Sequence, residues 1–360
     1  MRAGWCLGPV LMMIAVTACD EGDAADVCDG CASDEHCEVD AGIGTCEAVC
    51  TPPRLPRLAL LPVGVTLPLA PGTQVVLNLD AKSAVPADAW RDAAAVTLDT
   101  VGVMTVHTRW KTLPEACADE PFVADGNGAA ALEFVATYTV VERLPDALET
   151  DTAGDAVALD DSRIVAWASG WTRDSDFGSN LTDAWKDITR ALGPATGVWK
   201  DVVSLGNGGT LTFTFDAPMA DKPGLDLAVF ENGFTAAFLE LAWVEVSSDG
   251  NHFARFPSLS IQTESVAAYG TLDASEVTGV AGRYAGGYGT GFDLAHLSDD
   301  DAVLTGRVDL AAIRFVRIVD IIGDGLSLDS LGHALYDPTP TFGPAGFDVE
   351  AIAVLGGGLP

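Results

Sequence analysis

The stretch that decides the fold reads Leu225-Asp-Leu-Ala-Val-Phe-Glu-Asn-Gly-Phe234 and continues, after a short gap, as Ala242-Trp-Val-Glu-Val-Ser-Ser-Asp-Gly250. In its second half, Val244 and Val246 alternate with Trp243, Glu245 and Ser247. This period of two predicts a half-buried strand, because successive side chains of a strand point to opposite faces of its sheet. Asp249-Gly250 is typical of a tight turn, after which the chain returns as a second strand. The stretch therefore predicts a sheet protein.

Similar short runs recur on both sides of this stretch. One amphipathic helix is expected from Asn180 to Leu192, where Gly193-Pro194 ends it. Many strands and few helices favour a jelly-roll β-sandwich over residues 150–360, with a long inserted loop from Pro257 to Ala312. Its strands are expected at 163–168, 201–205, 210–215, 225–230, 242–248, 313–320 and 347–355.

A second, smaller unit is expected upstream. Prolines at 52, 53 and 56 indicate a linker, and strand-like runs follow at 74–79, 101–107 and 132–142. These runs predict a small β-sandwich over residues 51–149, and an acidic, alanine-rich linker at 147–160 separates it from the larger one. The fold class is therefore all-β, with a disulfide-rich N-terminal segment ahead of two sandwiches.

Several motifs carry a resemblance to a family of bacterial secreted and surface-anchored proteins that are described only as cell surface proteins. The motifs lie in order over residues 160–356: Val229–Phe234, Val244–Gly250, Tyr288–Leu294, Val316–Asp320, Gly332–Pro338 and Gly346–Asp348. The chain also resembles, more distantly, the discoidin and galactose-binding jelly rolls. That resemblance implies binding to sugars, lipids or proteins.

The N-terminus reads as an export signal. An apolar run from Trp5 to Val16 follows Arg2, and it is too short to span a bilayer as a helix. Val16-Thr-Ala-Cys19 resembles the bacterial lipobox, which implies cleavage after residue 18 and lipidation of Cys19. An ordinary signal peptide cleaved elsewhere is the alternative. We therefore expect an exported protein, held at the outer membrane or cell surface through its lipid alone.

The cysteine pattern agrees with export. Cys6 leaves with the signal and Cys19 takes the lipid. Five of the remaining six cysteines crowd into residues 28–50, a segment too short and polar to bury a core. Disulfides are expected to stabilise this segment, although a zinc knuckle built on Cys28-Asp-Gly-Cys31 is the alternative. The predicted disulfide cysteines are Cys28, Cys31, Cys37, Cys46, Cys50 and Cys117.

The formal charge of −33 repels nucleic acid and anionic lipid, so we expect neutral or cationic partners and no nucleic acid. No lysine or arginine occurs from Pro223 to Ala254 or from Ile318 to Pro360, yet these two stretches hold eleven carboxylates, among them Glu240 and Asp337. Solvated loop acids are one explanation, and a calcium site is the other. The candidate calcium ligands are Glu231, Asn232, Asp348 and Glu350 in one group and Asp320, Asp324 and Asp329 in a second.

A glycine-rich loop, Gly282–Gly291, contains Arg283, Tyr284 and Tyr288. Exposed aromatic rings stack on sugars or on partner side chains, so these residues and His333 are candidate ligand-binding residues for a glycan or a cell-surface protein. The chain has neither a Gly-x-Ser-x-Gly elbow nor His-Glu-x-x-His, which favours a binding protein over an enzyme. A carbohydrate-active hydrolase using acids of residues 320–350 and a purely structural envelope protein remain as alternatives.

The lipobox interpretation predicts the behaviour of a Cys19→Ser variant. Without the thiol that carries the lipid, the protein should move from the membrane fraction to the soluble fraction of the envelope, and labelling with a radioactive fatty acid should be lost. Fractionation and labelling in a bacterial host check this. Retention of the label by the variant would contradict the lipidation site.

Overall fold

The computed structural model describes residues 35–40, 43–48, 54–58, 60–78, 85–86, 88–110, 123–124, 130–150, 154–173, 175–233 and 235–356. The predicted signal peptide, Cys19 and four of the predicted disulfide cysteines (Cys28, Cys31, Cys50 and Cys117) lie outside these residues. Strands β1 (Glu35–Asp40) and β2 (Ile43–Ala48) pair antiparallel with Cys37 opposite Cys46. Among the described residues, no helix has the length and apolar character needed to cross a membrane.

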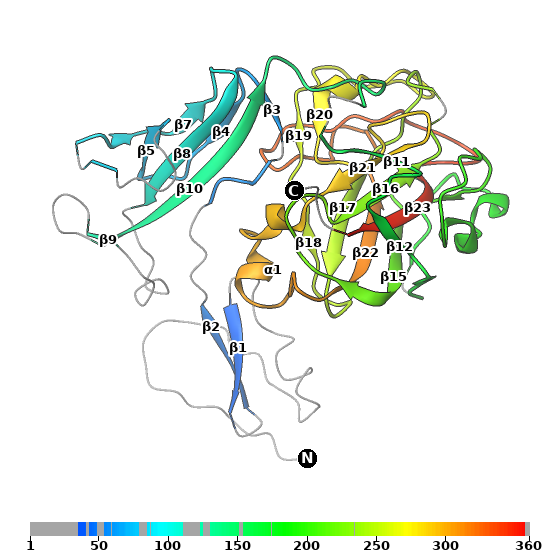
Figure 1. Cartoon of the computed structure of the whole chain (residues 1–360), viewed down its shortest axis with the longest axis horizontal. Coiled ribbons are helices and arrows are strands. Elements are labelled where there is room, and N and C mark those ends of the chain that lie inside the picture. Colours follow the sequence, from blue (N-terminus) through cyan, green and yellow to red (C-terminus); the bar gives the residue numbers. More distant parts are fainter. Residues whose placement is uncertain are drawn as a thin grey trace.

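Two antiparallel sheets form the larger sandwich, as Figure 1 shows, and the all-β prediction is confirmed. The first sheet has the order β11 (Ala156–Ala158), β21 (Tyr288–Phe292), β16 (Leu227–Glu231), β23 (Asp348–Leu355) and β12 (Ile164–Trp167), with β14 (Val203–Ser204) also on β23. The second has the order β13 (Gly170–Trp171), β15 (Thr210–Met219), β22 (Ile313–Asp320), β17 (Ala242–Ser247) and β18 (Ala254–Arg255).

Alternate side chains of the two sheets meet in one apolar core. Val229 of β16 and Ile352 of β23 face Phe213 of β15 and Val244 of β17 there. The opposite face of β16 is covered too, because Phe230 packs into a second cluster. Strands β16 and β17 are therefore buried along their whole length, whereas the sequence predicted a half-buried strand for β17.

The outer face of β17 explains this difference. Trp243 enters a third apolar cluster, and Glu245 is held between two arginines. Arg255 lies 2.6 Å from the Glu245 carboxylate and Arg317 lies 3.2 Å from it. A polar residue at an outward position therefore became buried through pairing with cations, which a period-two pattern does not reveal.

The predicted helix from Asn180 to Leu192 is wrong. The segment forms two short 3-10 helices, η2 (Asp183–Trp185) and η3 (Ile188–Ala191). Asp187 lies between them and accepts a hydrogen bond from the Thr189 amide at 3.2 Å, which starts a new turn instead of continuing the first. The cap at Asp187 thus divides the segment into two short helices, although the spacing of its apolar residues suits one continuous helix.

The segment from Pro257 to Ala312 is also more regular than the long loop that the sequence predicted. It contains β19 (Leu259–Ser260), η4 (Ala274–Glu276), β20 (Val277–Thr278), η5 (Leu294–Leu297) and α1 (Asp301–Leu304). It also supplies β21, which lies between β11 and β16 in the first sheet. The glycine-rich stretch before and within β21 is therefore part of the sandwich.

The smaller unit has a six-stranded sheet in the order β3 (Leu61–Pro62), β10 (Ala130–Val141), β8 (Gly102–Trp110), β5 (Thr73–Leu77) and β6 (Arg91–Asp92), with β9 (Val123–Ala124) on β10. A pair, β4 (Thr66–Pro68) and β7 (Ala95–Thr97), completes its core. Leu259 of the larger unit packs into this core. Arg54 and Arg57 form ion pairs with Asp299 of the larger unit, so apolar and ionic contacts join the two.

The shared core predicts a large effect for Phe213→Ala. Phe213 is fully buried between the sheets, so removal of its ring should lower the free energy of unfolding by about 3–5 kcal/mol. Urea denaturation measures this. The control Leu326→Ala, at a side chain that is 82% exposed, should change it by less than about 0.5 kcal/mol, and equal losses for both variants would contradict the assigned core.

Candidate functional site

Five buried carboxyls gather where the two sheets end. Glu231 ends β16 and Asp348 begins β23 in the first sheet, while Asp320 ends β22 in the second. Glu240 lies just before β17, and Asp337 lies in the loop that leads from β22 to β23. All five are buried. We call them the acidic cluster: Glu231, Glu240, Asp320, Asp337 and Asp348.

Hydrogen bonds position two carboxyls of the first sheet. Glu231 Oε2 accepts from the Gly233 amide at 2.7 Å, and a side chain at position 233 would come within 2.6 Å of the same oxygen. Any larger residue at position 233 would therefore displace the Glu231 carboxylate from this hydrogen bond. Asp348 accepts from the Ser204 hydroxyl and, at 3.0 Å, from the Asn232 side-chain amide.

Backbone amides position two further carboxyls. Asp320 accepts from the amides of Gly208 and Phe347, both at 2.7 Å. Asp337 accepts from the Leu241 amide at 2.8 Å. The loop that carries Asp337 is thereby bound to the residue next to Glu240, and the loop before β23 is bound to the end of β22.

Glu240 differs from the other four members. Its side chain is 1% exposed, and its Oε1 atom has no hydrogen-bond partner among the described residues. Burial raises its pKa well above the ordinary value, and the carboxyls of Asp348, Asp337, Glu231 and Asp320 raise it further. Of the five carboxyls, Glu240 is therefore the one whose negative charge is least stabilised by hydrogen bonds or by nearby positive charges.

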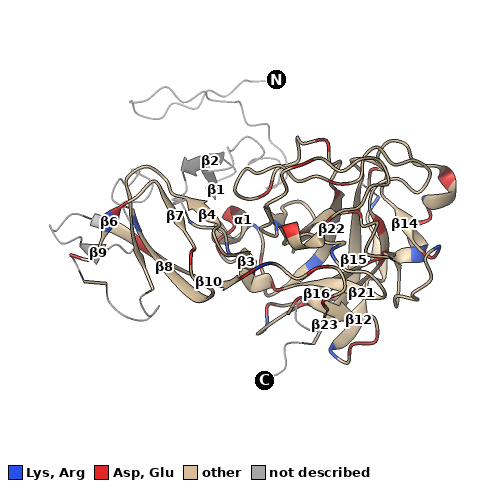
Figure 2. Cartoon of the chain, turned by 90° about the horizontal axis from the view of Figure 1, so that it is seen from above, with Lys and Arg blue, Asp and Glu red and all other residues tan. Residues whose placement is uncertain are grey.

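The other members share this environment. Burial raises the pKa of Glu231 and of Asp337 well above the ordinary range, and neighbouring carboxyls add to both shifts. Burial also raises the pKa of Asp320 and of Asp348 to about 6, against the opposing effect of their hydrogen bonds. Figure 2 shows how few basic residues the protein has to offset its acids. The cluster favours protons or a bound cation.

The first predicted calcium group is assembled only in part. Glu231, Asn232 and Asp348 come together as the sequence predicted. Glu350 is close enough to raise the pKa of Glu231, but its Oε1 accepts from the amides of Thr196 at 2.8 Å and Gly197 at 2.5 Å. Glu240 and Asp337 take part instead, although the sequence showed them only as two acids in stretches without basic residues.

The second predicted calcium group is not formed. Asp320 belongs to the acidic cluster, whereas Asp324 is exposed and caps the turn at the Leu326 amide, 2.9 Å away. Asp329 accepts from the amides of Ser260 and His333 at 2.7 and 2.8 Å. The three acids were predicted together because they are close in sequence. However, Asp324 and Asp329 each close a different turn, whereas Asp320 binds amides of distant loops. His333 is exposed, with Nδ1 3.1 Å from Asp329.

The prediction that Arg283 and Tyr284 form an exposed ligand-binding loop is also wrong. Both side chains are buried, and both bind Asp155, with Arg283 Nη1 at 2.8 Å. Arg283 also donates to the Pro145 carbonyl, so the pair fastens the linker between the two units. Tyr288 begins β21 opposite Ala158. Arg283 and Tyr284 are thus structural, whereas Tyr288 is only partly buried.

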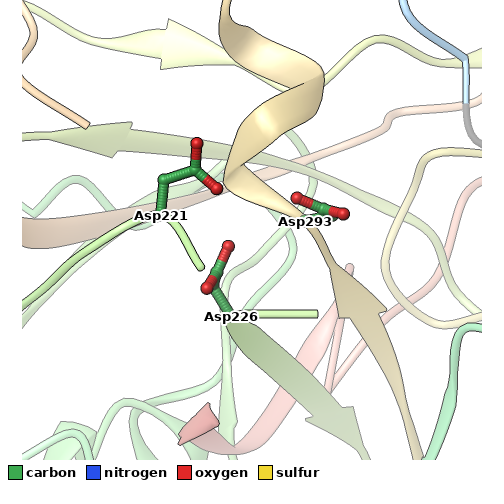
Figure 3. A group of neighbouring side chains, drawn as sticks. All are labelled: Asp221, Asp226 and Asp293. Atoms are coloured by element: carbon green, nitrogen blue, oxygen red, sulfur yellow. The ribbon is translucent and has the colours of Figure 1, made fainter. Parts of the chain in front are cut away.

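A group that the sequence analysis missed lies at the opposite end of β16. Figure 3 shows Asp221, Asp226 and Asp293 turned toward one another, with ligand oxygens within 4.8 Å. Asp226 accepts from the amides of Lys222 at 3.0 Å and Leu294 at 2.9 Å, and burial raises its pKa to about 6. Its residues come from turns before β16 and after β21, so only the pairing of these strands brings them together.

Exposed aromatic rings lie on the loops around the acidic cluster. We call Trp199, Tyr269 and Phe342 the aromatic rim, because these side chains are 50%, 57% and 56% exposed. Asn232, which donates to Asp348, also donates to the Trp199 carbonyl at 2.9 Å. The Tyr269 hydroxyl accepts from the Phe342 amide at 2.9 Å. The sequence analysis missed the aromatic rim, and the signal that could have identified it is the presence of aromatic residues within turn-rich segments.

Backbone contacts hold these loops side by side. Gly343, next to Phe342, donates to the Asn180 carbonyl at 3.1 Å and accepts from the Thr182 amide at 3.1 Å. The Thr182 carbonyl in turn starts η2, where Trp185 lies with its ring centroid 6.5 Å from that of Trp199. The aromatic rim is therefore carried by connected loops.

Comparisons with known proteins assign no family. No family model and no curated protein matches the chain. Among solved structures, a two-domain protein of unknown function from Bacteroides fragilis is similar over 70% of this chain and 59% of its own, with 10% identity and a TM-score of 0.23. The chain thus spans about three fifths of that protein. A protein described under carbohydrate-binding modules of the β-sandwich superfamily has 11% identity and a TM-score of 0.15, over 84% of this chain and 90% of its own.

The raised pKa values predict how the stability of a Glu240→Gln variant depends on pH. A carboxyl with a raised folded-state pKa stabilises the fold while protonated, and this stabilisation is lost as pH rises through that pKa. Without divalent cations, the variant should have a urea midpoint close to that of the wild type near pH 5 and above it at pH 8, because glutamine cannot ionise.

Comparison of the two proteins at each pH removes the titrations of groups outside the acidic cluster from this test. Burial lowers the pKa of His296, which adds stability as pH rises, but it does so equally in both proteins. Asp249, whose pKa is lowered to about 2, acts below this window. A difference that stays constant from pH 5 to pH 8 would contradict the raised pKa of Glu240.

Proposed function

We propose that this protein is an exported, lipid-anchored surface protein whose larger sandwich binds a neutral glycan through the aromatic rim, without cleaving it. The observation that carries the proposal is the exposure of three aromatic rings on connected loops at one end of a rigid sandwich. Aromatic faces stack on the apolar faces of sugar rings, and loops on a rigid scaffold are common binding surfaces.

The negative charge of the protein limits which kinds of glycan it can bind. At −33, the chain repels anionic polymers over the Debye length, so a neutral glycan fits better than an acidic one. Lys200 lies with its Nζ 4.6 Å from the Trp199 ring centroid and leaves that side chain half exposed. The rim therefore offers ring faces in a surface otherwise dominated by carboxylates.

The competing hydrolase interpretation requires acids that reach the substrate. Five of the six acids of residues 320–350 are buried, and the exposed one is Asp324. A polysaccharide cannot approach a carboxyl enclosed between two sheets, whereas glycoside cleavage needs two carboxyls flanking the sugar bond. The geometry thus supports binding more than cleavage. The export signal and Cys19 support a role at the cell surface.

Binding to insoluble cellulose, chitin and peptidoglycan, together with a glycan array, tests the proposal. The wild type should bind at least one neutral glycan, and Trp199→Ala or Phe342→Ala should weaken that binding by about tenfold, in line with the loss of one stacking contact. Trp171→Ala is the matched control, because Trp171 is an exposed tryptophan on edge strand β13 and outside the rim.

Three outcomes would contradict the proposal. Equal loss in the Trp171→Ala control would indicate non-specific adsorption. Release of reducing sugar from a bound polysaccharide would favour the hydrolase. Absence of binding to every glycan tested would leave a structural envelope protein as the better interpretation.

A further inference from the structure

Two acidic groups of the larger sandwich differ in how their oxygens are satisfied. At the Asp221 group, both oxygens of the buried Asp226 accept backbone amides. In the acidic cluster, Glu240 Oε1 is buried and has no hydrogen-bond partner among the described residues. A buried oxygen without a hydrogen-bond partner destabilises the fold, and more so if it is charged. Within the described part of the chain, the acidic cluster therefore lacks a donor or cation for Glu240 Oε1, whereas both oxygens of Asp226 already have partners.

The charges that surround the cluster are all of one sign. The groups that act on Glu231 are Asp348 and Glu350, and those that act on Asp337 are Asp320 and Glu231. Elsewhere in this sandwich, a buried carboxylate is paired with arginine, as Glu245 is with Arg255 and Arg317. Buried charges are normally paired or bound to metals, so the missing partner of the cluster is a cation.

The available donors select the kind of cation. The cluster offers carboxylate oxygens, with the Asn232 side chain beside Asp348, and none of its members is a cysteine or histidine. Hard oxygen donors suit calcium, whereas zinc and copper prefer nitrogen and sulfur. Calcium accepts six to eight oxygens in flexible geometry, while magnesium requires a near-octahedral set at shorter distances.

We propose that the acidic cluster binds one calcium ion, with Glu240 Oε1 as a ligand and with Glu231, Asp337 and Asp348 as the neighbouring carboxylates. Among the described residues, only the Asp221 group has three ligand oxygens within 4.8 Å of one another, so the side chains of the acidic cluster move inward around the ion. The ion joins the ends of both sheets below the loops that carry the aromatic rim. This site stands independently of glycan binding.

Calcium binding to the purified protein tests this site. After removal of metals with EDTA, addition of Ca²⁺ should raise the wild-type melting temperature, because an ion that binds only the folded state stabilises it by mass action. Isothermal titration calorimetry should give a single site. Mg²⁺ at the same concentration should produce a much smaller shift.

Two isosteric variants locate the ion. Glu240→Gln should bind Ca²⁺ at least tenfold more weakly, yet at pH 8 in EDTA it should melt above the wild type, since it removes one repelling charge. This stability in EDTA distinguishes loss of a ligand from failure to fold. Asp221→Asn is the matched control in the other acidic group and should keep the calcium response of the wild type.

The outcomes decide between the two groups and are separate from the glycan test. An unchanged wild-type melting temperature across micromolar to millimolar Ca²⁺ would overturn the proposal. So would a full calcium response in Glu240→Gln, or its loss in Asp221→Asn alone, which would assign the ion to Asp221, Asp226 and Asp293.

Discussion

Enclosure of negative charge where two sheets end is the constraint on which the rest of the larger sandwich depends. The core between the sheets is apolar and well buried, but β16, β22 and β23 each end or begin on a carboxyl. Backbone amides of the connecting loops partly satisfy these carboxyls, so the paths of the loops follow from the need to place donors there. The loop that carries Phe342 ends at one of these contacts, where the Phe347 amide donates to Asp320.

The acidic cluster and the aromatic rim are linked at one end of the larger sandwich. Asn232 contacts both Asp348 and the backbone of Trp199, and thereby spans the buried acids and the exposed rim. At the other end of β16, the Asp221 group closes turns with satisfied oxygens. The two ends therefore differ, because a buried carboxyl oxygen without a hydrogen-bond partner among the described residues occurs in the acidic cluster and not in the Asp221 group.

Predictions from the sequence succeeded where local pattern and tertiary environment agree. Alternation around Val244 and the turn at Asp249-Gly250 predicted strands that the structure contains. They failed where a distant partner decides the environment. The glycines around Arg283 and Tyr284 suggested an exposed loop. In the structure both side chains are buried, where they donate to Asp155 of the linker. The spacing of Leu181, Trp185 and Ile188 suits a helix, but the cap at Asp187 divides the segment.

The sequence by itself determined the all-β class, the high negative charge and the two acidic stretches without basic residues, since these follow from composition and short-range period. Only the tertiary structure decided which acids meet. Glu240 and Asp337 join Glu231 and Asp348, while Asp324, Asp329 and Glu350 each serve a different turn or loop. The physical reason is that a carboxyl's neighbours depend on strand order and loop path, and residues distant in sequence become adjacent only when β16 pairs with β23 and β17 with β22.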